Sequence, residues 1–280
     1  MWPLPQSSPG QTSKRTLMIK KLAKLSPILV FALINLSFVD LSSFENLFLD
    51  SPTLGTGDFA GCRQFFVKGQ IPTLRHSGDM RPRALCFSAF AVMHSGKSHT
   101  PIYVAERLNR QIILKARDNE RSNQFYADAR LPRAERAELD DYKGSGYDRG
   151  HMAPAADMID STAMEQSFSL ANMVPQAPLN NRKTWAAIEK ATRQYVLRAQ
   201  GDVYVITGPV YGPRPPTIGN NKVWVPKYLY KLVYDPNTGR AWAHWVENTD
   251  DAQVSKPISY QELTQKTGIQ FLPNLKQHDM

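Results

Sequence analysis

The sequence predicts a mixed α+β fold in which an antiparallel sheet is flanked by helices. Strand-like and helical segments do not alternate regularly along the chain, which argues against a doubly wound parallel sheet. Residues 228–234 and 241–246 are both strand-like, and the turn-forming Pro236 and Gly239 lie between them, so we expect a hairpin. The 280 residues are 42% apolar and 21% charged, which is typical of a chain with a packed core rather than a disordered one.

Two further strands are expected earlier in the chain, at residues 85–92 and 101–108. The segment between them, residues 93–100, contains Gly96 and is predicted to be a turn. Residues 115–147 are rich in charge and poor in β-branched side chains, so we expect a long surface loop with local turns.

The second half of the chain is expected to supply the main helix and another strand. Apolar residues recur at helical spacing between residues 185 and 197, which predicts an amphipathic helix. Residues 203–208 form an apolar run that ends in glycine and is typical of a buried strand. Residues 259–267 are predicted to form a short final helix.

The first 43 residues have the composition of an export signal. A basic stretch at residues 14–24 is followed by an uncharged apolar run at residues 25–39, which contains Pro27 and Asn35. This run is shorter than the roughly 20 residues that a membrane-spanning helix needs. We therefore expect residues 1–43 to be a cleaved signal peptide, with export to the periplasm or medium and no stable membrane insertion. The alternative is an N-terminal membrane anchor.

Residues 44–83 are rich in Gly, Pro, Ser and Thr and are expected to form an extended leader into the folded domain. Only two cysteines occur, Cys62 and Cys86. In an exported protein a lone pair tends to form a disulfide. Two cysteines without a nearby histidine pair are too few for a structural zinc site. Export therefore favours a Cys62–Cys86 disulfide over two separately buried thiols.

The net charge gives only weak information about partners. The formal charge is +9, and a basic surface attracts polyanions such as nucleic acids. Residues 1–43, however, hold five lysines and arginines against one aspartate, so removing them leaves +5. Many proteins that do not bind nucleic acid carry a charge of this size.

The first stretch that points to chemistry is the run Asp148-Arg149-Gly150-His151. In an extended segment, side chains two residues apart point to the same side, so Arg149 and His151 are expected to face one site. Histidine suits general-base work near neutral pH, and the arginine fork binds phosphate oxygens. Taken alone, the run also fits a structural histidine beside a surface ion pair.

A second group of residues follows about 30 positions later. Asn180 and Asn181 follow two prolines at an expected helix start, where either asparagine suits an N-cap. Asn181 and Glu189 are eight residues apart, which places them on one face of a helix about two turns apart. An amide oxygen and a carboxylate on one face can hold a hydrated Mg²⁺ ion. Trp185, which lies between them, is expected to pack in the core.

Together these residues resemble the DNA/RNA non-specific endonuclease family of the Serratia nuclease and endonuclease G type. The matching pattern is, in order, Asp148 to His151, Asn172-x-x-Pro175-Gln176, Asn181-x-x-x-Trp185 and Glu189. The resemblance spans about residues 84–275, which defines the expected domain. It implies a ββα-metal, or His–metal finger, fold with His151 on a strand and Asn181 at the start of the following helix.

The resemblance also implies the roles of the central residues. His151 is expected to be the general base and Arg149 to bind the scissile phosphate. Asn181 is expected to be the direct protein ligand of a single Mg²⁺ or Mn²⁺ ion. Glu189 is expected to act through one of the waters on that ion. Asp148 is expected to buttress the loop without a chemical role.

Two further substrate contacts are implied. Asn172 is expected to orient the site or to contact the phosphate. The family places another phosphate-binding arginine before the motif, for which Arg117, Arg121 and Arg130 are candidates, and Arg121 is our choice.

The activity implied by the resemblance is metal-dependent hydrolysis of DNA and RNA with little sequence preference, leaving 5′-phosphate ends. Two alternatives stay open. One is a phosphodiesterase that acts on small nucleotides. The other is a catalytically inactive nucleic-acid-binding module of the same fold, against which the joint presence of His151, Arg149, Asn181 and Glu189 argues.

Overall fold

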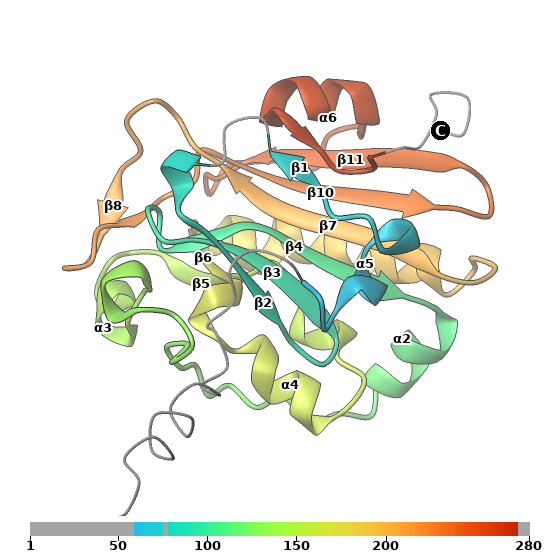
Figure 1. Cartoon of the computed structure of the whole chain (residues 1–280), viewed down its shortest axis with the longest axis horizontal. Coiled ribbons are helices and arrows are strands. Elements are labelled where there is room, and N and C mark those ends of the chain that lie inside the picture. Colours follow the sequence, from blue (N-terminus) through green and yellow to red (C-terminus); the bar gives the residue numbers. More distant parts are fainter. Residues whose placement is uncertain (1–58, 75–77, 274–280) are drawn as a thin grey trace, which may run out of the picture. The chain divides into compact units, whose positions relative to one another are not determined.

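The computed structural model describes residues 59–74 and 78–273. Their main element is a seven-stranded antiparallel sheet, shown in Figure 1, in the order β12-β11-β10-β7-β4-β3-β2. Its strands are β2 (Pro82–Cys86), β3 (Phe90–Ser95), β4 (Thr100–Leu108), β7 (Val203–Val210), β10 (Tyr228–Asp235), β11 (Arg240–Glu247) and β12 (Ile258–Ser259). The predicted α+β class with an antiparallel sheet is confirmed.

Several predicted elements are found where the sequence placed them. The hairpin of β10 and β11 pairs from Tyr228 opposite Glu247 to Asp235 opposite Arg240. The strands expected at residues 101–108 and 203–208 are β4 and β7. The final helix is α6 (Tyr260–Thr267), where the Ser259 hydroxyl accepts a hydrogen bond from the Glu262 N–H and so caps the first turn.

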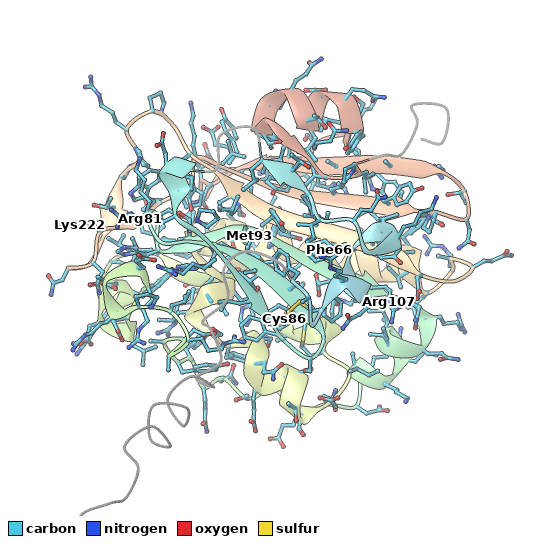
Figure 2. All side chains as sticks on the ribbon, viewed as in Figure 1. Phe66, Arg81, Cys86, Met93, Arg107 and Lys222 are labelled. Atoms are coloured by element: carbon cyan, nitrogen blue, oxygen red, sulfur yellow. A yellow bond between two sulfur atoms is a disulfide. The ribbon has the colours of Figure 1, made fainter. Side chains whose placement is uncertain are left out.

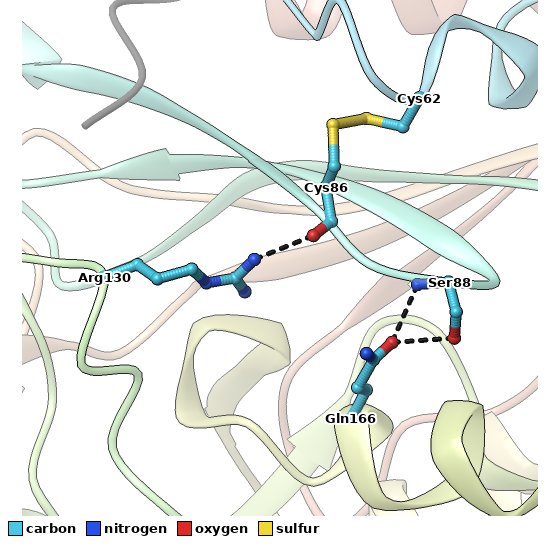
Figure 3. The surroundings of a disulfide bond; sticks show 5 residues. All are labelled: Cys62, Cys86, Ser88, Arg130 and Gln166. Carbon is cyan, nitrogen blue, oxygen red and sulfur yellow. Dashed lines mark hydrogen bonds between the residues drawn. A yellow bond between two sulfur atoms is a disulfide. The ribbon is translucent and has the colours of Figure 1, made fainter. Parts of the chain in front are cut away.

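The predicted single strand at residues 85–92 is wrong, because the chain turns between Cys86 and Phe90 and pairs β2 with β3. No Gly or Pro marks this turn. A distant side chain stabilises it instead, since Gln166 Oε1 accepts hydrogen bonds from the Ser88 N–H and hydroxyl, at 2.7 and 2.8 Å (Figure 3). The turn predicted at residues 93–100 is shorter than expected, since β3 continues to Ser95.

The expected surface loop after residue 115 is largely irregular, as predicted, with short helical segments in and before it. These are α2 (Arg110–Ala116), η4 (Arg133–Glu135) and α3 (Leu139–Tyr142). The N-cap of α2 is Asn109, whose side chain accepts a hydrogen bond from the Ile112 N–H.

One face of the sheet is covered by α6 and by the N-terminal part of the described chain. The small elements there are η1 (Arg63–Phe65), η2 (Val67–Gly69), β1 (Thr73–Leu74), η3 (Gly78–Met80) and β13 (Ile269–Gln270), which pairs with β1. Phe59 and Phe66 are buried against Tyr103 on β4. Residues 59–74 thus pack into the core. The extended leader expected over residues 44–83 did not predict this burial.

The predicted disulfide is present and joins Cys62 to Cys86, at the end of β2 (Figures 2 and 3). It ties the N-terminal segment to the edge strand of the sheet. The backbone carbonyl of Cys86 also accepts a hydrogen bond from Arg130, at 2.7 Å. This edge is therefore anchored from two directions.

The other face of the sheet carries the elements that form the site. They are β5 (Asp148–His151), η5 (Ala155–Asp157), α4 (Ser161–Ser167), η6 (Leu170–Asn172), β6 (Met173–Gln176), η7 (Asn180–Trp185) and α5 (Ala186–Val196). A small hairpin, β8 (Thr217–Ile218) with β9 (Val223–Trp224), lies outside the main sheet. Trp185 and Ile188 are buried in one apolar cluster with Val104 and Leu229 of the sheet, which confirms the core position expected for Trp185.

The first 58 residues lie outside the described part of the chain. The predicted signal peptide at residues 1–43 and the first part of the predicted leader fall there. Within the described ranges, no helix has the length and apolarity needed to span a membrane.

Candidate active site

The site begins on the two-stranded antiparallel ribbon of β5 and β6. Gly150 pairs with Val174 and His151 with Met173, so His151 is the last residue of its strand. Gly150 has no room for a side chain, since a Cβ there would collide with the side chain of Gln176. Glycine at this position therefore lets the two strands approach and sets where His151 emerges.

Asn172 holds the chain that follows His151. Its Nδ2 donates to the carbonyls of Ala153 and Ser167, and its Oδ1 accepts from the Ala153 N–H, all at 2.9 Å. The residue is fully buried. The structure therefore does not bring Asn172 into contact with a phosphate, and of the two roles expected for it the geometry fits the orienting one.

The imidazole of His151 is held by two aromatic rings. Its centroid lies 4.9 Å from that of Phe168, edge to face, and 5.8 Å from that of Phe125. His151 is 8% exposed, and its Nε2 is buried without a hydrogen-bond partner among the described residues. Nδ1 is therefore the ring nitrogen that a water in the adjoining cavity can reach.

Burial, together with the positive charge of Arg121, lowers the pKa of the His151 imidazole to about 3. The ring is thus neutral at any ordinary working pH. A neutral imidazole has a free lone pair and can accept a proton, which a general base requires.

The same two aromatic rings position two arginines. The Arg149 guanidinium lies 4.2 Å from the ring centre of Phe125, and that of Arg121 lies 4.9 Å from the ring centre of Phe168. Arg121 also donates a hydrogen bond from Nε to Asn123, at 2.7 Å. Neither arginine forms an ion pair with a carboxylate of the described chain, so both guanidinium groups are available to a phosphate.

The other two arginines considered for this role lie elsewhere. Arg130 is paired with Asp128, at 2.7 Å, and does not line the cavity that contains His151. Arg117 lines a neighbouring cavity rather than this one. Among the three candidates, the structure places only Arg121 beside His151.

The helix that carries Asn181 starts with a π-helical turn, η7, before it continues as α5. Neither asparagine caps it. Asn180 is buried and bridges the backbone of the sheet to β6, because its Nδ2 donates to the Glu247 carbonyl and its Oδ1 accepts from Gln176. π-Helical turns are frequent at functional sites, where the extra residue redirects side chains.

Asn181 is oriented by the first residue of the motif. Its Nδ2 donates to Asp148 Oδ2, at 2.9 Å, and Arg182 donates to both carboxylate oxygens of Asp148, at 2.6 and 2.8 Å. With Nδ2 committed to Asp148, the amide oxygen of Asn181 is left without a partner among the described residues. Asp148 thus fixes which atom Asn181 presents to the cavity.

Glu189 lies two turns along the same helix, half-buried. Burial raises the pKa of its carboxyl to about 7, although the nearby ammonium group of Lys231 acts in the opposite direction. Lys231 is fully buried below the helix and donates to Thr207. Glu189 is therefore a carboxyl group that is half charged near neutral pH.

These side chains meet in one cavity of about 740 Å³. The residues from the sequence prediction that line it are Arg121, Asp148, Arg149, His151, Asn181 and Glu189. Only Asn172 of the predicted site residues is absent from its lining. Segments far apart in the sequence, the loop after α2, strand β5 and the η7–α5 helix, thus contribute to one polar site.

The donors in this cavity fit a hard divalent cation. Asn181 offers a free amide oxygen and Glu189 a carboxylate, and oxygen ligands are those that Mg²⁺ prefers. No cluster of three or more His, Cys, Asp or Glu ligands occurs in the described ranges. Mg²⁺ commonly keeps several of its waters in proteins and does not require such a cluster.

Comparison with known proteins agrees with this geometry. Residues 69–278 match the family model of the DNA/RNA non-specific endonucleases. The chain belongs to this family. The match begins before residue 84, where the sequence alone had placed the start of the resemblance.

Individual nucleases are also similar to this chain in sequence. A nuclease of Nostoc sp. is 34% identical over 203 residues, which cover 66% of this chain and 72% of that protein. The mitochondrial nuclease 1 of Schizosaccharomyces pombe is 35% identical over 156 residues. That match covers 51% of this chain and 48% of the yeast protein, so it spans about half the length of that relative.

A solved structure supports the fold. The crystal structure of the EndoG/EndoGI complex contains a chain that superposes with a TM-score of 0.65 at 22% identity, covering 80% of this chain and 95% of that one. The ββα-metal fold expected from the sequence is thereby confirmed.

Two features of this family member's site were not found by sequence reasoning. Phe125 and Phe168, which hold His151 and both arginines, lie in irregular or turn segments without any motif around them. Asp148 was part of the motif, but its hydrogen bond to Asn181 joins residues 33 positions apart and depends on the tertiary fold. The position of Asp148 at the start of the motif was the only feature of the sequence that pointed to a role for it.

Proposed function

We propose that this chain is a metal-dependent endonuclease that hydrolyses phosphodiester bonds of DNA and RNA with little sequence preference. The observation that carries the proposal is the convergence of His151, Arg149, Asn181 and Glu189 on one cavity. Membership of the non-specific endonuclease family supports the same reaction. Mg²⁺, or Mn²⁺ in its place, is the cofactor that the oxygen donors fit.

His151 takes the proton from the attacking water. Its lowered pKa keeps it neutral before the reaction. Because Nε2 is buried, Nδ1 is the nitrogen left to accept the proton. As attack proceeds, negative charge grows on the phosphoryl oxygens and favours the imidazolium form. The proton affinity of His151 therefore rises at the moment when the proton has to move.

Arg149, over the ring of Phe125, and Arg121, over the ring of Phe168, bind the phosphate. Asn181 would hold the cation directly, and Glu189 would hold it through one of its waters. When bound, Mg²⁺ offsets the charge on the phosphoryl oxygens and lowers the pKa of its waters. In-line attack expels the 3′-oxygen, which takes up a proton from a water to become the 3′-hydroxyl, and leaves 5′-phosphate ends. Contacts to the phosphate backbone carry no base information, so we propose little sequence preference.

We also propose that the protein is exported, with residues 1–43 as a cleaved signal peptide. Support comes from the basic and apolar pattern of that segment and from the Cys62–Cys86 disulfide, since disulfides persist in oxidising compartments. The competing proposal is that the same segment stays attached as a membrane anchor.

The proposed reaction is tested by offering three substrates to the purified full chain with Mg²⁺. Plasmid DNA, single-stranded RNA and a chromogenic phosphodiester are compared at equal enzyme concentration. We expect cleavage of both polymers, with 5′-phosphate ends that DNA ligase accepts. Hydrolysis of the chromogenic diester alone would instead favour the phosphodiesterase of small nucleotides. Binding of the polymers without cleavage would favour the inactive module.

The raised pKa of Glu189 makes the metal dependence sensitive to pH. In the metal-free protein its carboxyl is protonated below pH 7 and charged above it. The charged form attracts the cation and its waters, so cation binding releases a proton. We expect the Mg²⁺ concentration for half-maximal cleavage to rise as pH falls below 7, by up to about tenfold per pH unit.

The measurement is a series of Mg²⁺ titrations of cleavage between about pH 5.5 and pH 8.5. Glu189→Gln should flatten the pH dependence. Glu165→Gln, which changes an exposed carboxyl on α4 that does not line the cavity, should keep the profile of the unchanged protein. A pH profile of Glu189→Gln that matches that of Glu165→Gln would refute the role of Glu189.

A further inference from the structure

A second cavity, of about 370 Å³, adjoins the proposed active site. Arg121, Ala155 and Ala156 line both cavities, so the second continues directly from the first. Helices α2, α4 and α5 contribute most of the other lining residues. On α5, consecutive residues divide between the two cavities, with Glu189 in the first and Lys190 in the second.

The second cavity differs from the first in its charge. Its cationic side chains are Arg117, Arg121, Lys190 and Arg193. No Asp or Glu is among its described lining residues. Its apolar part is formed by side chains of α2, α4 and the end of α5, namely Ile113, Met164 and Leu197. The surface is thus a basic rim around an apolar floor.

Besides Arg121, which the first cavity shares, two of these cations are free to bind a ligand. Arg193 is committed, because its Nη1 lies 3.0 Å from a carboxylate oxygen of the buried Asp157. Arg117 and Lys190 are exposed, and neither forms an ion pair within the described ranges. Asp118 and Glu120 are close to Arg117 in sequence but line neither cavity. The cavity therefore presents uncompensated positive charge.

We propose that the second cavity is a subsite for the nucleic-acid strand next to the scissile phosphate. Arg117 and Lys190 contact flanking phosphates there, and the apolar floor receives a sugar or base. This inference rests on the proposed function, because it takes the first cavity as the place of cleavage. A small phosphodiester substrate has no group that reaches beyond Arg121, whereas a strand continues past it. The subsite thus selects polynucleotides over mononucleotide esters.

The chemistry of the subsite is that of the sugar–phosphate backbone, which DNA and RNA share. Phosphate contacts supply affinity and register without reading sequence. Each phosphate that a cation neutralises releases counterions, so the contacts are visible in the salt dependence of binding. This readout does not depend on cleavage.

The test uses the double variant Arg117→Ala/Lys190→Ala in the His151→Ala background, so that substrate is not consumed. Binding of fluorescent single-stranded DNA and RNA oligonucleotides is followed by anisotropy across a series of salt concentrations. We expect the Kd to rise about tenfold and the slope of log Kd against log salt to fall by about 1.4, from two contacts of roughly 0.7 each. Equal effects on DNA and RNA indicate a backbone subsite, and an effect on one polymer alone would overturn it.

The matched control is Lys115→Ala/Arg198→Ala in the same background. It removes the same two charges from α2 and the end of α5, at exposed positions that line neither cavity. We expect its Kd, and its slope of log Kd against log salt, to equal those of His151→Ala alone. If both double variants weaken binding equally, the effect is general charge and the subsite is refuted. Thermal melts check that all variants fold.

A second measurement separates this inference from the proposed function. With His151 intact, the ratio of kcat/KM for a long oligonucleotide to that for a dinucleotide should fall in Arg117→Ala/Lys190→Ala and not in the control. Absence of cleavage by the unchanged protein would overturn the proposed function and, with it, the subsite. Cleavage with an unchanged ratio would overturn the subsite alone.

Discussion

His151→Ala is expected to lower the rate of DNA and RNA cleavage by about 10²- to 10⁴-fold, the usual contribution of a general base. Glu189, the other group of the cavity that titrates near neutral pH, is assigned to the cation rather than to the attacking water. The arginines stay protonated, and Asn181 does not titrate. Burial and Arg121 hold the pKa of His151 to about 3, so the lost group is a neutral base and not a cation that binds phosphate. Substrate affinity should therefore change little.

Cleavage rate and oligonucleotide Kd are measured on the same protein preparations. His244→Ala is the matched control, because His244 lies on β11 and does not line the cavity. The space left by the imidazole opens onto the cavity, so added imidazole should partly restore cleavage by His151→Ala. A His151→Ala protein that cleaves as fast as the His244→Ala control would refute the assignment of the base.

Most of the sheet followed from local patterns in the sequence. Strands β4, β7, β10 and β11 are apolar runs bounded by turn residues, and these signals act over a few positions. The prediction failed at residues 85–92, where a side chain 78 positions away stabilises a turn that contains neither Gly nor Pro. A contact of this range leaves no local pattern.

The burial of the N-terminal segment was likewise not predictable from local sequence patterns. Residues 59–74 contain little regular secondary structure. Even so, Phe59 and Phe66 pack against Tyr103, and the disulfide joins Cys62 to the sheet. Gly- and Pro-rich composition predicted an extended leader, and the described part of it holds short helical turns and strands. The composition carried no information on whether the side chains between these residues are buried.

The composition of the site was predicted better than its internal contacts. Strand periodicity placed Arg149 beside His151, and helix periodicity placed Asn181 and Glu189 on one face. The resemblance to the nuclease family joined these two pairs in one site. The hydrogen bonds of Asp148 to Asn181 and Arg182, and the buried amide of Asn172, depend on how β5, η6 and η7 meet in space. Sequence spacing does not encode those encounters.

Asn181→Ala is expected to have the second large effect, through the metal. The substitution removes the free amide oxygen that Asp148 orients toward the cavity. Loss of this proposed ligand should raise the Mg²⁺ requirement by on the order of 100-fold or more. Asp148→Ala, which leaves the ligand but frees its orientation, should have a smaller effect of about 10- to 100-fold.

The matched control for this substitution is Asn220→Ala, in the exposed turn between β8 and β9, which lines neither cavity. Its Mg²⁺ requirement should equal that of the unchanged protein. The order expected for the Mg²⁺ requirement is therefore Asn181→Ala above Asp148→Ala, with Asn220→Ala unchanged. A reversal of the first two would assign the ligand role to Asp148.

A single titration tests the central claim, that His151 works beside a cation held at Asn181. Plasmid cleavage by the full chain and by Asn181→Ala is measured from an EDTA-treated starting point through increasing Mg²⁺. We expect no cleavage in EDTA, a saturating rise for the unchanged protein, and a curve for Asn181→Ala displaced to much higher Mg²⁺. Cleavage that persists in EDTA, or two curves that superimpose, would contradict it.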